Sequence, residues 1–599
     1  MRKHLGIAIL FGAVVFATPS RGHAEETRLD DFEGARAPEP WTFSNGPEFP
    51  GAKGSLTRGA GHSGSGAHLA YDFSGGGAYV AASLKLATPI NAAEVGFWVR
   101  APAVIHAWLR VVDSTRQVLQ YGLARPFGAD DPSAWFRQVV ELDAPDGHFG
   151  GTNDGVLHGA ITQVTILAAN PLEKGAVGAI DFDEVVAIDA VGATIDLSTT
   201  PMIAEAPGRA DLASRLAVNI HFTRDDAGLN AAKGMGFSRV RMDFPWSAVE
   251  STKGVYNFSN HDALVASLAA RGMTLHLILD YGNRLYPPTG DPAFVSTTVP
   301  AFGAYAKAAA AHFAGKGVTF EIWNEANLEH FWMSAPNASD YAALANAAIA
   351  AMHAGDPSAK VSTTGVSGYD FAFVRGYLAD GGADGADAIG VHPYRLSGGE
   401  TITDDTLLLR SIAGALPGAP AVWDTEWGYS STSFGGDGHA PTARAMQATF
   451  VVREILSAWA VGFPLAVVYD LRDDGTDPTN AEHNYGLIAN DYTDKPAAVS
   501  VRALGDVAKG RVFKGLLDLE PTSLYAMRLD GPRDVVVALW SGMPHGRVPV
   551  TLVNAKSATS MLGTSIDISS GSIVVKNEDG PTYVTFDLQP RSPRLVGFR

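Results

Sequence analysis

Short segments in which apolar and polar residues alternate dominate the first part of the chain, from about residue 25 onward. Examples are AHLAYDF at 67–73, EVGFWVR at 94–100 and IDFDEVVAI at 180–188. Gly, Pro, Asn and Asp separate these segments, and no long stretch of helical periodicity interrupts them. Alternation with period two and frequent turn residues predict antiparallel strands, so we expect a β-sandwich over residues 25–192.

From about residue 193 to 508 the pattern changes, because apolar, β-prone segments now alternate with Ala-rich segments of helical periodicity, such as 301–314, 338–355 and 443–462. The candidate strands are LAVNIHF (216–222), RVRMDF (239–244), TLHLIL (274–279), TFEIW (319–323), KVSTTG (360–365), AIGVH (388–392), AVWDTEW (421–427) and LAVVYD (465–470). Eight strands, each followed by a helix, predict a (β/α)8 TIM barrel over residues 193–508. A doubly wound sheet alternates in the same way, but the count of eight and the nearly continuous apolar strands favour the barrel.

The alternation with period two returns over residues 509–599. SLYAMRL (523–529), DVVVALW (534–540) and TYVTFDL (582–588) are clear examples. We therefore expect a multidomain chain, in which a central TIM barrel is flanked by an N-terminal β-sandwich and a smaller C-terminal β-sandwich.

The first residues have the pattern of an export signal. A short basic stretch, MRKH, precedes thirteen apolar residues from Leu5 to Ala17, which are too few to span a bilayer comfortably. Small residues at Gly22 and Ala24 mark a cleavage site, so residues 1–24 are predicted to be a secretory signal peptide; the alternative is a membrane anchor. No later segment is long and apolar enough to cross a membrane, so we expect a secreted or periplasmic protein without a membrane span.

Charge and cysteine content narrow the classes of function. The 599-residue chain carries a net charge of −18 and contains no cysteine. Cleavage after Ala24 would remove Arg2, Lys3 and Arg21 and no acid, which would change the net charge to −21. An acidic protein without a basic segment is a poor partner for nucleic acid. Without disulfides, the stability must come from the hydrophobic cores.

Two glutamates stand at the ends of predicted barrel strands. Glu325 falls just past the end of the fourth strand in TFEIWNE, and Glu426 just past the end of the seventh strand in AVWDTEW. Active sites of TIM barrels lie at the C-terminal ends of the strands, and strands four and seven are on opposite sides of the mouth. We therefore expect the two carboxylates to face each other across a cleft. Opposed carboxyl groups about 5–5.5 Å apart are what a retaining glycosidase needs, one as acid/base and one as nucleophile.

These positions resemble those of the clan A glycoside hydrolases, whose barrels carry an Asn-Glu pair after strand four and a Glu after strand seven. The resemblance implies that Glu325 is the acid/base and that Glu426 is the nucleophile. It also implies that Asn324 binds the 2-hydroxyl of the sugar.

VHPY at 391–394 resembles the His-x-Tyr that ends strand six in the same clan. The resemblance implies that Tyr394 holds Glu426 through its hydroxyl and that His392 lines the same wall. Arg241, on the second strand, is expected to reach Glu426 and to keep it ionised.

Within the clan, the sequence is most similar to glycoside hydrolase family 39. IWNEANL at 322–328, HPY at 392–394 and the later segments NYGLI and KPAAVSVRAL carry this likeness, which covers about residues 190–599. The family includes β-xylosidases and bacterial exopolysaccharide hydrolases, and the barrel with a trailing sandwich and an export signal resembles the latter. One departure is Ala326, where the family commonly has Pro after the acid/base.

Aromatic and polar residues near the strand ends are expected to form a sugar-binding cleft, because sugar rings stack on aromatic rings and sugar hydroxyls need polar partners. The alternative for each aromatic residue is a place in the core. The aromatic candidates are Trp246, Tyr281, Trp332, Trp427 and Tyr469, and the polar candidates are Asp280, Asn283, Asp470 and Arg472. Asp243 and Asp424 are closer to the strand interiors and are expected to support the site.

The two ends of the N-terminal domain resemble those of jelly-roll carbohydrate-binding modules. The segments concerned are LDDFEG at 29–34 and AIDFDEVVAID at 179–189. In such modules the first and last strands lie side by side and can share a structural calcium, which implies that Glu33, Asp181 and Asp183 are candidate ligands. The alternative is that these acids face solvent.

The sequence thus predicts a retaining β-glycoside hydrolase that acts on an extracellular or periplasmic polysaccharide or oligosaccharide. It contains no phosphate loop, nucleotide fingerprint or catalytic metal spacing, so we expect no cofactor for catalysis, and a calcium would be structural. Three alternatives stay open: a non-catalytic carbohydrate-binding or surface-assembly protein on a barrel scaffold, an exo-acting β-xylosidase, and a polysaccharide lyase.

Overall fold

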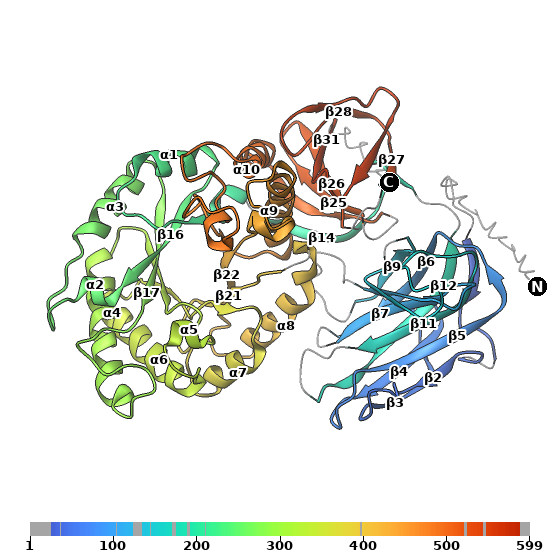
Figure 1. Cartoon of the computed structure of the whole chain (residues 1–599), viewed down its shortest axis with the longest axis horizontal. Coiled ribbons are helices and arrows are strands. Elements are labelled where there is room, and N and C mark those ends of the chain that lie inside the picture. The colour runs from blue at the N-terminus through green and yellow to red at the C-terminus, as the bar shows by residue number, and fades with distance from the viewer. Residues whose placement is uncertain are drawn as a thin grey trace, which may run out of the picture.

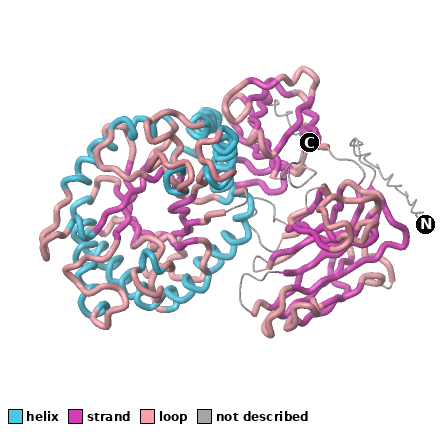
Figure 2. The backbone as a smooth tube through the Cα atoms, viewed as in Figure 1, coloured by secondary structure: helices cyan, strands magenta, loops and turns pink. Residues whose placement is uncertain are grey.

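The computed structural model describes residues 26–35, 38–102, 105–123, 134–143, 145–169, 175–188, 192–209, 211–395, 398–519, 524–542 and 547–587. The predicted signal peptide at residues 1–24 lies outside these ranges. Within them the chain forms two strand-rich bodies and one body in which helices surround strands (Figure 1, Figure 2). No helix in this part of the chain combines the length and the apolar character needed to cross a membrane.

The N-terminal body is a sandwich of two six-stranded antiparallel sheets. One sheet contains β1 (Glu26–Asp30), β3 (Lys53–Ala60), β4 (Ser65–Asp72), β6 (Glu94–Arg100), β9 (Phe136–Glu141) and β12 (Val177–Ile188). The other contains β2 (Thr42–Ser44), β5 (Tyr79–Ile90), β7 (His106–Val112), β8 (Val118–Gly122), β10 (Gly147–Phe149) and β11 (Ile161–Ala169). Alternate residues of the strands, among them Leu69, Phe97 and Phe182, fill the core between the sheets. The first strand, β1, pairs with the last, β12.

The central body is the closed parallel barrel that the alternation of strands and helices predicts. Its strands are β15 (Leu216–Asn219), β16 (Arg239–Pro245), β17 (Thr274–Asp280), β18 (Val318–Ile322), β19 (Lys360–Ser362), β20 (Val366–Ser367), β21 (Ala388–His392), β22 (Ala421–Trp427) and β23 (Ala466–Val468). All neighbours are parallel, and β15 pairs with both β16 and β23, so the sheet returns to its first strand. The fifth strand is divided into β19 and β20, which both pair with β21.

Helices surround the barrel strands, as Figure 2 shows. They are α1 (Asp226–Gly234), α2 (Trp246–Val249), α3 (Ser259–Ala269), α4 (Val299–Phe313), α5 (Glu329–Trp332), α6 (Ala338–Gly355), α7 (Phe371–Ala379), α8 (Thr403–Gly414), α9 (Pro441–Val461) and α10 (Pro496–Ala508). Single turns occur at η1 (Leu212–Ser214), η2 (Phe294–Thr298), η3 (Gly399–Ile402), η4 (Ser431–Phe434) and η5 (Ala481–Asn484). The three Ala-rich segments form α4, α6 and α9, as predicted. Small residues allow α4 and α6 to pack closely, since a Cβ at Gly303 would lie 3.3 Å from the carbonyl oxygen of Ala347.

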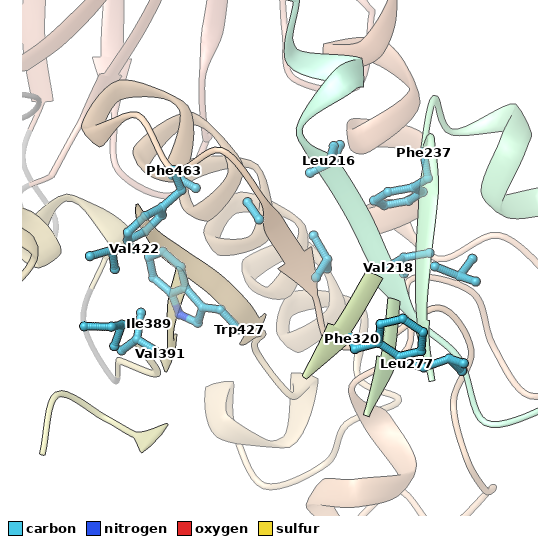
Figure 3. Close-up of a cluster of buried hydrophobic side chains, with 14 of the residues drawn as sticks. Leu216, Val218, Phe237, Leu277, Phe320, Ile389, Val391, Val422, Trp427 and Phe463 are labelled. Carbon is cyan, nitrogen blue, oxygen red and sulfur yellow. The ribbon is translucent and has the colours of Figure 1, made fainter. Parts of the chain in front are cut away.

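The barrel strands bury every second side chain against the helices (Figure 3). Leu216 and Val218 of β15, Leu277 of β17 and Phe320 of β18 are all buried in one cluster with the helices. Burial of such a side chain contributes about 1.5–3 kcal/mol. Because side chains alternate along a strand, the intervening residues point into the barrel, and these are the residues that build the site described below.

The C-terminal body is a sandwich of a seven-stranded and a three-stranded sheet. Its strands after the barrel are β24 (Val512–Leu517), β25 (Leu524–Asp530), β26 (Asp534–Ser541), β27 (Arg547–Leu552), β28 (Ala555–Thr559), β29 (Ser565–Ile566), β30 (Ser572–Lys576) and β31 (Thr582–Asp587). Two more strands come from the segment before the barrel: β13 (Ala193–Ile195) pairs with β27, and β14 (Met202–Arg209) pairs with β24. The predicted start of the barrel domain at residue 193 is therefore wrong, because residues 193–209 complete the C-terminal sandwich.

The C-terminal sandwich shares a core with the barrel. Phe513, Trp540 and Tyr583 belong to the same buried cluster as the barrel strands. At this junction the carboxylate of Glu400 accepts hydrogen bonds from Arg453 of α9, at 2.7 Å, and from Trp540 of β26, at 2.5 Å. All three side chains are buried, so little water competes for these bonds.

Candidate active site

The two predicted catalytic glutamates meet at the C-terminal mouth of the barrel. Glu325 follows β18, and Glu426 lies near the end of β22. One carboxylate oxygen of each and a ring nitrogen of His392 all lie within 4.8 Å of one another. The side chains of Glu325 and Glu426 are 9 % and 14 % exposed, so both are largely desolvated and still reach the mouth.

The backbone turns sharply where Glu325 leaves the strand. Trp323 and Glu325 both have left-handed backbone angles, with φ of 72° and 44°. Such angles cost a residue with a Cβ about 1–3 kcal/mol and occur most often at functional sites. The N–H of Glu325 donates to the carbonyl oxygen of Gly365, at 3.0 Å, which ties the turn to the next strand segment. Position 325 is therefore held in a defined place at the mouth.

Arg241 of β16 connects the groups around both glutamates. Its Nη1 donates to Oε2 of Glu426, at 2.6 Å, which is the contact expected from the sequence. Its Nη2 donates to Oδ1 of Asn324, at 2.9 Å, and its Nε donates to Oε2 of Glu321, at 2.9 Å. Because Arg241 is only 1 % exposed, its charge depends on these carboxylates for stabilisation.

Glu426 is held as a carboxylate. Besides the bond from Arg241, Oε1 accepts a hydrogen bond from the hydroxyl of Tyr394, at 2.9 Å, and lies 4.0 Å from Nδ1 of His392. Burial alone would raise the pKa of Glu426, but the charges of His392 and Arg241 and the bond from Tyr394 outweigh burial and lower it. An ionised, desolvated carboxylate is the state that a nucleophile needs.

His392 contacts the other glutamate. Its Nδ1 lies 2.9 Å from Oε1 of Glu325. Burial lowers the pKa of His392, but the carboxylate of Glu426 and the hydrogen bonds with Glu321 and Glu325 outweigh burial and raise the pKa to about 10. At neutral pH the ring therefore holds a proton on Nδ1 that is directed at Glu325.

Glu321 is a site residue that the sequence analysis missed. It is 0 % exposed and accepts hydrogen bonds from Arg241, from the N–H of Gly365, at 2.7 Å, and from the hydroxyl of Thr425, at 3.1 Å. Burial opposes its charge, but Arg241 and two buried histidines hold the pKa of Glu321 well below its usual range. A signal was present in the sequence, because a charged residue in the middle of the apolar strand TFEIW must face the interior and find a partner there.

Another charged group lies where β15 and β23 end. Nδ1 of His221 is 2.9 Å from Oδ1 of Asp474 and 3.7 Å from Oδ2 of Asp470. Its Nε2 is 2.9 Å from the amide of Asn219. Burial lowers the pKa of His221, but Asp474 and Asp470 outweigh burial and raise it to about 9. Asp470 was expected to bind hydroxyls, whereas His221 and Asp474 were not predicted.

Three of the predicted aromatic platforms are wrong. Trp246, Trp332 and Trp427 are each 0 % exposed, so no sugar ring can stack on them. Trp246 stacks on Tyr286, with 4.8 Å between ring centroids, and Trp332 packs against Trp323, with 5.1 Å between centroids. These three rings belong to the same buried cluster as the barrel strands.

The other two predicted aromatics are partly exposed. Tyr281 stacks on Phe331, with 5.9 Å between ring centroids. Tyr469 meets Tyr485 edge to face at 5.2 Å, and Tyr485 lies 6.3 Å from Tyr394. Tyr485 was not predicted, but its ring adjoins the tyrosine that binds Glu426, so it is a better platform candidate than the three buried tryptophans.

Two predicted hydroxyl-binding residues have structural partners instead. Asn283 is buried, its Nδ2 donates to the carbonyl oxygen of Glu250, at 2.8 Å, and its Oδ1 accepts from the N–H of Leu285, at 3.0 Å. It therefore closes a loop, and its prediction as a substrate ligand is wrong. Arg472 pairs with Asp225, at 3.5 Å, and its guanidinium stacks over the ring of Tyr492.

Two groups at the mouth have the spacing of a metal site. They are Glu325 with His392 and Glu426, and His221 with Asp470 and Asp474. A metal requires a deprotonated imidazole, whereas the pKa values of His392 and His221 are raised to about 10 and about 9. Both groups are therefore better suited to ion pairing than to metal binding.

The predicted calcium ligands of the N-terminal sandwich are only partly suited to a cation. Asp181 already binds Arg100, at 2.8 Å, and His68, at 2.6 Å. Oδ2 of Asp183 accepts from the N–H of Ser63, at 3.1 Å, and Oε1 of Glu33 accepts from the N–H of Ser65, at 2.7 Å. Glu33 and Asp183 thus converge on one turn, and burial raises the pKa of Asp183. A structural calcium at Glu33 and Asp183 stays a prediction, and Asp181 is not suited to join it.

Comparison with solved structures identifies relatives in fold. A family 39 glycoside hydrolase from the gut symbiont Bacteroides cellulosilyticus WH2 matches with a TM-score of 0.53 and 16 % identity, over 82 % of this chain and 98 % of the other. A monomeric beta-xylosidase from Caulobacter crescentus CB15 matches with a TM-score of 0.48 and 17 % identity, over 67 % of this chain and 100 % of the other.

No protein-family model and no curated protein matches the sequence. The first structural match therefore establishes the fold, in agreement with the resemblance to family 39 seen in the sequence. At 16 % identity the match shows the fold and not the activity.

Proposed function

We propose that this protein is a retaining β-glycoside hydrolase that acts on an extracellular or periplasmic polysaccharide or oligosaccharide. The observation that carries the proposal is the separation of Glu325 and Glu426. A carboxylate oxygen of Glu325 lies within 4.8 Å of a carboxylate oxygen of Glu426. Retaining enzymes place their carboxyl groups about 5–5.5 Å apart, whereas inverting enzymes need about 6.5–9.5 Å to admit a water molecule. The separation supports double displacement.

Glu426 and Glu325 divide the reaction between them. In the first step Glu426 attacks the anomeric carbon, the bond from that carbon to the leaving oxygen breaks, and the leaving oxygen takes a proton from Glu325. In the second step Glu325 removes a proton from water, the water oxygen attacks the same carbon, and the ester bond to Glu426 breaks. Two successive inversions return the sugar in its original β-configuration.

The neighbouring residues prepare these roles. Arg241 and Tyr394 orient Glu426 and keep it ionised through bonds of 2.6 and 2.9 Å. His392 keeps a proton close to Glu325, so the pair can supply the proton that the leaving oxygen needs. Oδ1 of Asn324 accepts a hydrogen bond from Arg241, which leaves Nδ2 of Asn324 to donate to the 2-hydroxyl of the sugar.

The buried charges favour an enzyme over a non-catalytic glycan-binding protein. Arg241, Glu321 and His392 are each at most 1 % exposed, and desolvating a charged group costs several kcal/mol. A barrel that served only as a scaffold would be more stable with apolar residues at these positions. An exo-acting β-xylosidase would use the same residues, and the length of the released product distinguishes it from an endo-acting enzyme.

Product analysis on a polysaccharide panel tests the proposal. We expect the wild type to release sugars from the exopolysaccharide of its host, from xylan or from a β-glucan, and nuclear magnetic resonance to detect the β-anomer first. Glu426→Gln should lower kcat by about 10⁴-fold or more, and Glu325→Gln by about 10²–10⁴-fold. Glu578→Gln, an exposed change in the C-terminal sandwich, serves as the control and should leave the rate unchanged.

Added azide separates the two roles. In Glu325→Gln with an aryl glycoside, azide should attack the glycosyl-enzyme and yield a β-glycosyl azide. In Glu426→Ala, azide should enter the space of the lost nucleophile and yield an α-glycosyl azide. Normal turnover by Glu426→Gln, or an α-anomer as the first product of the wild type, would reject the assignment. Binding of the panel without any product would favour the non-catalytic alternative, and an unsaturated sugar end would favour a lyase.

A further inference from the structure

The mouth of the barrel carries more acidic than basic side chains on one side. We use the name acidic wall for Asp243 of β16, Asp470 and Asp474 after β23, and Glu482 of η5. Asp470 and Asp474 both lie within 3.7 Å of Nδ1 of His221. Burial, and then the charges of Glu426 and Asp474, raise the pKa of Glu482. Glu482 therefore lies close enough to the nucleophile Glu426 for the two charges to interact.

One carboxylate oxygen of the wall lacks a partner. Asp470 is 3 % exposed, and its Oδ1 has no hydrogen-bond partner among the described residues. Asp280, at the end of β17, is 0 % exposed and lies against Asp243, so no ligand reaches it. Burial, followed by the carboxylate of Asp243, raises the pKa of Asp280 well above its usual range. Asp470 is therefore the buried residue of the wall to which a bound group can supply a missing donor.

The basic residues nearby are committed elsewhere. Arg241 donates to Glu321 and Glu426, and Lys495 donates to Asp473, at 2.9 Å. Arg472 pairs with Asp225. His221 pairs with Asp470 and Asp474. His261 lies 3.2 Å from the carbonyl oxygen of Asp243, and burial lowers the pKa of its ring.

Even with favourable protonation, the acidic wall keeps a negative charge. If Asp280, Asp470 and Glu482 are all counted as neutral and His221 as charged, the formal charges of Asp243 and Asp474 still outnumber that of the one imidazolium. Glu426 adds its own negative charge, which Arg241 balances. A sugar held between the catalytic glutamates and this wall therefore enters a negative potential.

We propose that the sugar bound against the acidic wall carries a free ammonium group, so that the substrate is a glycan with β-linked hexosamine residues that lack N-acetyl groups. This inference rests on the proposed glycosidase function and narrows its substrate class. An ammonium group supplies three N–H donors and a positive charge to the oxygens of Asp470 and its neighbours. A hydroxyl supplies one donor without charge, an acetamido group has lost the charge, and a uronate would be repelled.

The charge of the whole chain acts in the same direction. A net charge of −18 attracts a cationic polymer and repels an anionic one before contact is made. The preference for an amino sugar should therefore weaken with salt, because exposed charges such as Asp474 are screened within about 8–10 Å at physiological ionic strength.

The test compares sugars that differ in a single substituent. The probes are p-nitrophenyl β-glycosides of glucosamine, glucose, N-acetylglucosamine and glucuronic acid, the galactosamine and galactose pair, and the matching β-1,4-linked oligomers of glucosamine, glucose and N-acetylglucosamine. At about pH 6, where the amine is protonated, we expect kcat/KM for the amino sugar to exceed that for its hydroxyl counterpart by roughly ten-fold or more. This ratio should fall several-fold between about 20 and about 500 mM salt.

Charge-removing variants locate the effect. Asp470→Asn and Asp474→Asn keep the side-chain shape and should each lower the ratio of amino sugar to neutral sugar by roughly three-fold or more, mainly through KM. Asp506→Asn, which removes an exposed acid on α10, is the matched control and should leave the ratio unchanged. Binding of methyl β-glucosaminide and methyl β-glucoside to Glu325→Gln, measured by calorimetry, gives the same comparison without turnover.

The outcomes separate the inference from the function on which it rests. Cleavage of neutral glycosides with no gain for the amino sugar, or equal rates for the glucuronide, would overturn the inference and leave the glycosidase intact. No cleavage of any glycoside, together with tighter binding of the amino sugar by Glu325→Gln, would reject the activity and retain the charge preference. An equal change of the ratio in Asp506→Asn would show that bulk charge, and not the acidic wall, is responsible.

Discussion

The barrel interior predicts a large and pH-dependent penalty for the loss of Arg241. In Arg241→Met a side chain of similar length removes the guanidinium that bonds Glu321, Glu426 and Asn324. Glu321 is 0 % exposed and keeps the N–H of Gly365, the hydroxyl of Thr425 and, at 3.7 Å, the ring of His392. Removal of one partner from a buried ion pair costs about 3–5 kcal/mol, because the remaining charge loses its main compensation.

The sign of the pH dependence follows from the carboxylates. In the wild type the pKa values of Glu321 and Glu426 are lowered. Their contribution to stability is therefore fully present above the pKa of an unfolded Glu, about 4.3, and is lost as the pH falls through their pKa values in the folded protein. Without Arg241 burial is opposed by fewer charges, so the pKa values of Glu321 and Glu426 both rise from their wild-type values, and the variant carries a penalty at neutral pH that protonation relieves. The difference in stability between the two proteins should therefore be about 3–5 kcal/mol near pH 7 and should shrink toward about pH 4.

Urea unfolding followed by tryptophan fluorescence measures this difference at several pH values. Arg241→Met/Glu321→Gln is the informative second variant, since it removes the stranded charge and should regain part of the lost stability. An Arg241→Met protein as stable as the wild type near pH 7, or a penalty that grows as the pH falls, would refute the reasoning. A double variant less stable than the sum of its single changes would show that Glu321 is not the stranded partner.

Three further changes have defined outcomes. Tyr394→Phe removes the hydroxyl that lowers the pKa of Glu426, so the acid limb of the kcat/KM profile should move up by about 0.5–1 pH unit, and an unmoved limb would contradict this. Trp540→Phe removes the donor to Glu400 at the junction of barrel and sandwich, so it should lower the free energy of unfolding by about 1–2 kcal/mol with little change in kcat/KM. A catalytic defect without a loss of stability would argue against a purely structural role for this hydrogen bond. If Glu33 and Asp183 bind calcium, a chelator should lower the melting temperature of the wild type and of Asp181→Asn but not that of Asp183→Asn, and a melting temperature insensitive to chelator would remove the site.

The local pattern of the sequence was enough to predict the barrel and its two glutamates. Apolar strands alternate with Ala-rich helices, and both features depend on neighbouring residues. Glu325 and Glu426 stand at strand ends, and the geometry of a closed parallel sheet brings those ends together at one mouth. The sequence alone therefore predicts that these two residues, about a hundred positions apart, meet at the mouth.

Features that depend on tertiary packing were not predictable in the same way. Trp246 and Trp332 follow strands as a sugar platform would, but both rings are buried in the core cluster of the barrel. The strands β13 and β14 find their partners only beyond the barrel, so no local signal separates them from the barrel domain. Glu321 lies between these cases, since its position in an apolar strand was visible but its partner Arg241 was not.

The pairing of β14 with β24 has a consequence for synthesis of the chain. During translation β14 leaves the ribosome before the first barrel strand, whereas β24 follows only after the last barrel helix. The C-terminal sandwich must therefore wait for the complete barrel, and until then the backbone of β14 is an open edge that other chains could join. A ribosome that stops anywhere within the barrel leaves that edge uncovered, so truncated chains should be insoluble rather than partly active.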